Sequence, residues 1–301
     1  MSRMRCSTIT AIIAGLAISA WGCDGADDGE RFDTGGDADA DGDTDSDVDT
    51  DSDSDSDSDS DTDGDIDTDT ECYEKIDIVF AIDVSTTMSG YLSTLEDEIG
   101  LVWEAAEEIS ADDDPHFGLC VFVDDFLLVS PQTYTSVSDI KSDFNYWYNH
   151  TSTNQQTQSN ATNSDWPENT LDALYEAATA YQWRDQDLTL RVVIHATDDT
   201  FREHPDSFSS GIPATHTYEE TVQALQEQTI RVASFAAHLG GPAGNADVEP
   251  GFYTDYQGQS SIPEATSAMV FDIDEVGDTI SLADAINDFV IEEFCSDYVP
   301  E

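Results

Sequence analysis

The residues best suited to chemistry in this chain are carboxylates and hydroxyls at the ends of apolar stretches. The stretch 76–82 runs directly into Asp83-Val84-Ser85-Thr86-Thr87, and the stretch 191–196 runs into Thr197-Asp198-Asp199. Carboxylate and hydroxyl oxygens are hard donors, which suit Mg²⁺, Mn²⁺ or Ca²⁺ and suit zinc poorly. The same residue types are preferred helix N-caps, so a single segment of this kind is equally consistent with the start of a helix.

A third polar segment, 165–170, leads into Leu171-Asp172-Ala173-Leu174, where a helical pattern starts. Its hydroxyl closest to the helix belongs to Thr170. Capping and metal binding are compatible here, because one residue can begin a helix beside a bound ion. The three segments together therefore predict a metal site more strongly than any one of them alone.

Hydrolysis is the alternative chemistry, since Ser85, His195 and Asp198 have the residue types of a nucleophile, a base and an orienting acid. His195 lies inside an apolar stretch, which is typical of a sheet histidine. The chain has no G-x-S-x-G elbow, and its other histidines have no H-E-x-x-H spacing. We therefore expect no enzyme.

From residue 76 onward, short apolar runs alternate with amphipathic segments, which predicts an α/β fold with a doubly wound, mostly parallel sheet and helices on both faces. The expected strands are 76–82, 117–123, 126–129, 190–196, 230–236 and 269–271. The expected helices are 89–109, 137–148, 169–182, 218–228 and 280–294. Ligands of open α/β sheets bind at the carboxyl ends of strands, so we expect the polar loops 149–169 and 199–217 to frame the site.

The three polar segments, in this order, resemble the metal-ion-dependent adhesion site of von Willebrand factor type A domains. The first loop of that family has the pattern D-x-S-x-S, and Thr87 keeps the last hydroxyl. The resemblance covers Cys72 to about Cys295. It implies a site for Mg²⁺, with Mn²⁺ or Ca²⁺ possible, made by Asp83, Ser85, Thr87, Thr170 and Asp198. Asp199 stands where the family often has Gly, so the choice between the two adjacent aspartates stays open.

The resemblance also implies a function. In the family the hydroxyls of Ser85, Thr87 and, in some states, Thr170 would touch the metal, while Asp83 and Asp198 act largely through water. Such an ion is under-neutralised and accepts a partner's Glu or Asp carboxylate. We therefore expect a monomeric protein-binding module of the adhesion type, with Trp166 as an aromatic anchor. The alternative is a structural envelope protein whose domain binds no metal.

The amino terminus resembles a bacterial lipoprotein signal. Arg3 and Arg5 precede an apolar stretch, 9–20, that is too short to span a bilayer as a helix. Ala20-Trp21-Gly22-Cys23 then resembles a lipobox, in which the Cys is lipidated. We expect a signal peptide at 1–22 and a lipid on Cys23 that anchors the protein in the cell envelope on the extracytoplasmic side. Ordinary secretion is the alternative.

A spacer follows at 23–71. Every odd position from Asp37 to Asp69 is Asp, and such a segment has no apolar face to bury, so we expect disorder. Residues 59–67 fit the opening of a calcium loop, but Glu71 stands one position too late to close it.

The remaining domain, 72–301, is also acidic. The full chain has 66 acidic and 9 basic residues, and its net charge of −57 excludes nucleic acid as a partner.

Three cysteines remain in the domain: Cys72, Cys120 and Cys295. Export places them in an oxidising compartment. Cys120 lies in an apolar run, where a buried inert thiol is expected. The resemblance implies a disulfide between Cys72 and Cys295, because secreted members of the family link their neighbouring termini.

Overall fold

The computed structural model describes residues 72–238, 248–277 and 279–300. The predicted signal peptide, Cys23 and the Asp-rich spacer lie outside the described residues. The described residues belong to one compact unit. Within them, no helix combines the length and the hydropathy that crossing a bilayer would require.

Within the described residues, six strands form one mixed sheet with the order β3-β2-β1-β4-β5-β6. All neighbouring strands are parallel except β2 and β3, which form an antiparallel pair. The prediction of a mostly parallel α/β sheet is thus confirmed, and β6 begins one residue later than predicted. The bounds are β1 Lys75–Asp83, β2 His116–Phe122, β3 Phe126–Ser130, β4 Thr189–Thr197, β5 Ile230–Ala236 and β6 Val270–Asp272.

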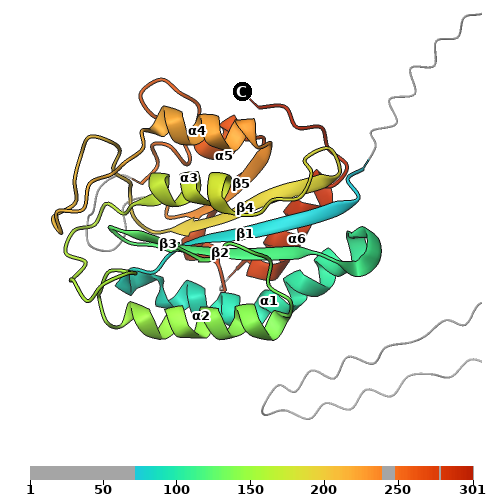
Figure 1. Ribbon diagram of the computed structural model, residues 1–301, viewed down its shortest axis with the longest axis horizontal. Helices are drawn as coiled ribbons and strands as arrows, with labels where there is room; N and C mark the ends of the chain where they lie inside the picture. The colour runs from blue at the N-terminus through green and yellow to red at the C-terminus, as the bar shows by residue number, and fades with distance from the viewer. Residues whose placement is uncertain (1–71, 239–247, 278, 301) are drawn as a thin grey trace, which may run out of the picture. The chain divides into compact units, whose positions relative to one another are not determined.

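Helices cover both faces of the sheet (Figure 1). One face carries α1 Ser89–Ile109, α2 Val137–Thr151 and α6 Leu282–Glu293. The other face carries α3 Thr170–Ala180, α4 Tyr218–Glu227 and α5 Ile262–Ala265. Short 3-10 turns lie at Thr86–Met88, Ala111–Asp113 and Ile273–Glu275.

The core lies between the central strands and these two helical layers. In β1 the residues from Ile76 to Asp83 are all buried, because a parallel strand covered on both faces has no side that meets water. From α1, the side chains of Leu92, Leu95 and Ile99 are buried against the sheet. Burying one such side chain contributes about 1.5–3 kcal/mol, so the i, i+3, i+7 spacing fixes which face of α1 points inward.

The chain leaves β1 and β4 in opposite directions across the sheet. From β1 it passes through α1 to β2, and from β4 it passes through α4 to β5 on the other side. Where two neighbouring parallel strands diverge in this way, a crevice opens beyond their carboxyl ends. Asp83 is the last residue of β1, and Thr197 is the last residue of β4. The fold therefore places both polar segments at one crevice.

The disulfide between Cys72 and Cys295 is present, with the two Cα atoms 4.0 Å apart. Beside it, the backbone N–H of Tyr73 donates to the carbonyl of Phe294 at 2.9 Å. Cys120 is free and buried, and burial raises the pKa of its thiol. These cysteine assignments agree with the sequence predictions.

Candidate metal centre

Asp83 is fully buried at the end of β1, and its carboxylate is held by two donors. The backbone N–H of Ser85 donates to Oδ1 at 2.7 Å, and the hydroxyl of Thr197 donates to Oδ2 at 2.9 Å. The hydroxyl of Thr197 also accepts a hydrogen bond from the backbone N–H of Asp199 at 3.1 Å. Thr197 therefore ties the loop after β4 to the carboxylate that ends β1.

A second chain of contacts joins the two loops nearer the surface. The Ser85 and Thr87 hydroxyl oxygens lie 3.2 Å apart, and the Thr87 hydroxyl donates to Asp198 Oδ1 at 2.9 Å. Ser85 is buried, Asp198 is partly buried and Thr87 is exposed. Four of the five predicted metal residues are therefore linked by direct contacts, although they lie in segments more than a hundred residues apart.

Three buried carboxylates converge at this place. One oxygen from each of Asp83, Glu168 and Asp199 lies within 4.8 Å of the other two. Glu168 Oε1 accepts a hydrogen bond from Asn163 Nδ2 at 2.8 Å, whereas its buried Oε2 has no hydrogen-bond partner among the described residues. Asp199 is the member of this group that lies in the loop after β4. Its neighbour Asp198 is linked to the site by the hydrogen bond that it accepts from the Thr87 hydroxyl.

Thr170 is the first residue of α3 and is fully buried. Its hydroxyl has no hydrogen-bond partner among the described residues. Glu168, two residues earlier, is the residue of this segment whose carboxylate lies near that of Asp83. The role of Thr170 as a metal ligand stays a prediction. Glu168 is a member of the carboxylate cluster that sequence reasoning missed.

The electrostatics of the three carboxylates favour a cation between them. Burial, together with the charges of Asp198 and Asp199, raises the pKa of Asp83. Burial and the charge of Asp83 raise the pKa of Glu168, and burial with the charge of Asp198 raises the pKa of Asp199 to about 7. Buried like charges at this separation repel strongly unless a counter-charge is present. The donor set therefore fits a hard divalent ion.

The two polar loops predicted to frame the site contact each other beside it. The backbone N–H of Glu168 donates to the carbonyl of Thr200 at 2.7 Å, and Arg202 forms an ion pair with Asp165 at 2.9 Å. Further out, the hydroxyls of Ser164 and Ser209 lie 2.7 Å apart. Trp166, in the first loop, is 57% exposed.

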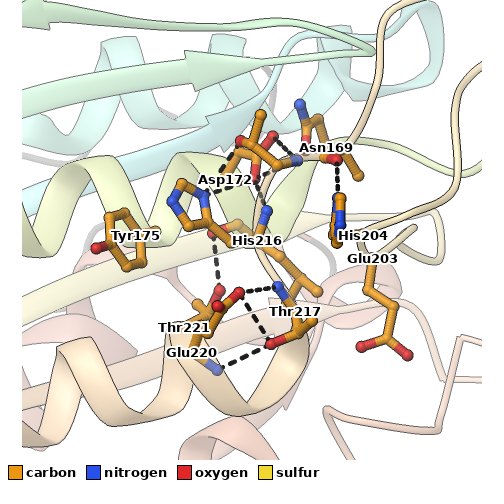
Figure 2. Close-up of polar contacts among 12 residues, drawn as sticks. Asn169, Asp172, Tyr175, Glu203, His204, His216, Thr217, Glu220 and Thr221 are labelled. Atoms are coloured by element: carbon orange, nitrogen blue, oxygen red, sulfur yellow. Dashed lines mark hydrogen bonds and ion pairs between the residues drawn. The ribbon is translucent and has the colours of Figure 1, made fainter.

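Figure 2 shows how the second loop is fastened to α3. Asp172 is buried on α3 and accepts hydrogen bonds from the backbone N–H groups of Thr215 and His216. The His216 Nδ1 atom lies 2.8 Å from Asp172 Oδ1, and the His216 ring stacks on Tyr175 with centroids 3.6 Å apart. These contacts hold the end of the loop in place before α4 begins.

His195, the base of the hydrolytic alternative, lies buried within β4. Its ring stacks on Phe122 and Phe252, and its Nδ1 atom lies 3.1 Å from the hydroxyl of Ser234. Burial lowers the pKa of His195 to about 3. This is the environment of a structural sheet histidine.

Comparisons with known proteins find only distant structural similarity. No family model matches the chain, and no curated protein matches it. Among solved structures, proximal thread matrix protein 1 from the mussel byssus is similar, with 16% identity and a TM-score of 0.44 over 76% of this chain. This chain covers 48% of that protein, about half of its length. An aerotolerance-related membrane protein from Bacteroides fragilis shows 14% identity and a TM-score of 0.41 over 72% of this chain and 99% of that one.

Proposed function

We propose that residues 72–301 form a von Willebrand factor type A-like module that binds a divalent cation, most favourably Mg²⁺, at the carboxyl ends of β1 and β4. The observation that carries this proposal is the convergence of the buried carboxylates of Asp83, Glu168 and Asp199 next to the hydroxyls of Ser85 and Thr87. Oxygen donors of this type are those that Mg²⁺, Mn²⁺ and Ca²⁺ prefer.

The bound ion would have a closed side and an open side. The three carboxylates are buried, whereas Thr87 is exposed. A position on the Thr87 side is therefore within reach of an external oxygen ligand, and we propose that a partner protein fills it with a Glu or Asp carboxylate. Because the domain is acidic, the favoured partner offers that carboxylate from an otherwise neutral or basic surface.

Glu168 also favours a second candidate function, a purely structural metal. Three carboxylates carry more negative charge than one divalent ion neutralises. A divalent ion bound by three carboxylates attracts a further anion less strongly than an ion bound by two carboxylates and neutral hydroxyls. In that case the ion would brace the crevice, and the loops would have no metal-dependent partner.

Bound water distinguishes the two candidates. Mn²⁺ with an open position keeps an exchangeable water, which enhances the relaxation of bulk water protons. We expect this enhancement in the wild type, and we expect a Glu-containing peptide to reduce it more than the same peptide with Gln. The Asp83→Asn variant gives the background from the Asp-rich spacer. Enhancement no greater than that background, with Mn²⁺ bound at the site, would favour the structural metal.

The proposed location rests on the sequence alone. A lipid on Cys23 would tether the spacer and domain to the envelope on the extracytoplasmic side, with the domain acting as a monomer. Replacing Cys23 with Ser should move the protein from the membrane fraction to the soluble fraction. Retention in the membrane fraction would contradict the lipid anchor.

A further inference from the structure

The sheet ends at β6, and within the described residues no strand pairs with its outer side. The backbone N–H of Ser234 in β5 donates to the carbonyl of Met269, so Met269 and Phe271 direct their backbone polar groups toward β5. Because this direction alternates along a strand, Val270 and Asp272 direct theirs outward. An edge of this kind is a template for pairing with a further strand.

Each face of β6 borders a hollow. On the α6 side, Phe271 and Phe289 line a hollow of about 370 Å³. On the α5 side, Val270 and Phe252 line another of about 730 Å³, and Met269, the residue before β6, borders both. Successive side chains of a strand point to opposite faces of a sheet. A strand added to β6 would therefore send alternate side chains into the two hollows, while its main chain pairs with the edge.

The hollow beside α6 has an acidic rim. Asp284, Asp288 and Glu292 line it, and no basic side chain is among the described residues that do so. The three positions are spaced i, i+4 and i+8 on one face of the helix, so neighbouring members lie about 6 Å apart along its axis. Residues i and i+2 of an extended strand lie roughly 6.6 Å apart. Basic side chains at alternate positions of an added strand would therefore match this acidic row in spacing and in charge.

The hollow beside α5 suits apolar side chains between the basic ones. Phe252, Pro263 and Val270 line it. Arg231 also lines it, but this side chain is 1% exposed and already forms an ion pair with Glu293 at 3.0 Å. It therefore adds no free positive charge that would repel a basic strand. The two hollows together favour one alternation, with basic residues toward α6 and apolar residues toward α5.

We propose that β6 is a docking edge for an extended segment of a partner protein, which adds to the sheet as a further strand. The segment carries basic residues at every second position, facing the acidic row of α6, and apolar residues between them. Other parts of this chain have the wrong charge: a second copy would bring its own acidic edge, and residues 37–69 are rich in Asp. The docking edge uses none of the proposed metal-binding residues, so it does not rest on the proposed function.

The probe is a capped, fluorescein-labelled peptide of alternating Lys and Val, titrated with the full chain and followed by fluorescence anisotropy. The Asp-rich segment 37–69 also attracts this peptide, and that background is common to all variants. Asp288→Lys reverses the charge in the middle of the acidic row and should weaken binding at least about fivefold. Asp97→Lys makes the same change at an exposed position of α1 and should leave the affinity within about twofold of the wild type.

Two N-methylated forms of the peptide test the main-chain pairing without changing its charge. In an antiparallel addition, the N–H groups that face β6 belong to the Val residues, and in a parallel addition they belong to the Lys residues. N-methylation of one set should therefore weaken binding at least about tenfold through lost hydrogen bonds, and N-methylation of the other set should not. Equal binding of the two forms overturns strand addition.

Three further results would also overturn the proposal. Equal peptide binding by Asp288→Lys and Asp97→Lys would remove the acidic row from the site. A wild type that sediments as a dimer, with Asp288→Lys as a monomer, would assign the edge to a second copy. Peptide binding that is lost in EDTA would assign the peptide to the metal centre, whereas we expect EDTA to leave it unchanged. Matching melting temperatures of the two variants show that both are folded.

Discussion

At the residue scale, the candidate centre differs from the pattern that the resemblance predicts in two carboxylates, Glu168 and Asp199, which lie close to Asp83. The pattern supplies hydroxyls and two aspartates, and Asp83, Ser85, Thr87 and Asp198 do lie together. Glu168 could not be predicted from the pattern, because the pattern expects a hydroxyl in that segment and Thr170 offers one. The available signal was the residue type alone, since Glu is a hard-oxygen donor in a loop at the carboxyl edge of the sheet.

The convergence of Glu168 and Asp199 on Asp83 changes the expected ranking of variants. From the sequence alone, Asp198→Ala would match Asp83→Ala, and Asp199→Ala would be milder. From the geometry we expect Glu168→Gln and Asp199→Asn each to weaken Mn²⁺ binding by at least about tenfold, or ~1.4 kcal/mol, and Asp198→Asn to weaken it less. Titration calorimetry measures the order of these affinities, with Asp97→Asn, a charge change at an exposed position of α1, as the control. An unchanged affinity in Glu168→Gln would remove Glu168 from the site.

The buried position of His195 leads to a separate prediction about how the stability of the domain depends on pH. Its folded pKa of about 3 lies below the value of about 6.5 expected in the unfolded chain. The unfolded state therefore binds more protons between these values, and His195 causes stability to fall as the pH drops below about 6.5. The slope from this one group is at most about 1.4 kcal/mol per pH unit. In urea unfolding at pH 7, 6 and 5, the difference in stability between wild type and His195→Gln should shrink as the pH falls. A constant difference would show that folding does not lower the pKa of His195.

At the element scale, apolar runs located the six strands of the described residues. Four of them, β1, β2, β4 and β5, are buried and nearly continuous in apolar residues, whereas β3 and β6 are short and half-buried. α5 was missed, because four residues are too few to show helical periodicity. Its start is nevertheless encoded locally: the Ser261 side chain caps the backbone N–H of Glu264, and Pro263 lies in the first turn. The order of the strands in the sheet is known only from the structure, because the sequence pattern does not indicate which strands are neighbours.

Two glycines test how closely the elements pack. A Cβ atom on Gly118 in β2 would lie 2.5 Å from the Tyr181 ring, whereas one on Gly100 in α1 would meet nothing within 4 Å. We expect Gly118→Ala to destabilise the domain by about 1–3 kcal/mol through overpacking. Gly100→Ala, as the matched control, should stabilise it by about 0.5–1 kcal/mol through helix propensity. Urea unfolding measures both, and a neutral Gly118→Ala would show that Tyr181 moves aside freely.

At the scale of the whole molecule, the domain is closed by the Cys72–Cys295 disulfide, which joins a residue shortly before β1 to a residue shortly after α6. Such a long loop is expected to stabilise the fold by roughly 4–5 kcal/mol on the chain-entropy account. Cys72→Ser/Cys295→Ser should therefore lower the unfolding free energy by an amount of this order. Cys120→Ser is the control for loss of a thiol, and an equal effect in both variants would contradict a role for the crosslink.

The strongly acidic composition disfavours acidic partners. It also adds a background of bound metal to any measurement of metal binding. The alternating aspartates from Asp37 to Asp69 attract divalent ions diffusely wherever they lie. A comparison that leaves this segment unchanged is therefore needed to isolate one site in the domain. Asp83→Asn meets this requirement, because it keeps an oxygen acceptor for the Ser85 N–H and an amide that can donate to Thr197.

The most direct test of the account is calorimetric titration of Mg²⁺ and Mn²⁺ into EDTA-stripped wild-type protein and into Asp83→Asn. The account predicts a saturable component with one ion per chain in the wild type, absent in Asp83→Asn, above a weak background common to both. It also predicts that Asp83→Asn is at least as stable as the wild type without metal, because the variant removes a buried negative charge. Identical titration curves for the two proteins would contradict the metal centre at the carboxyl ends of β1 and β4.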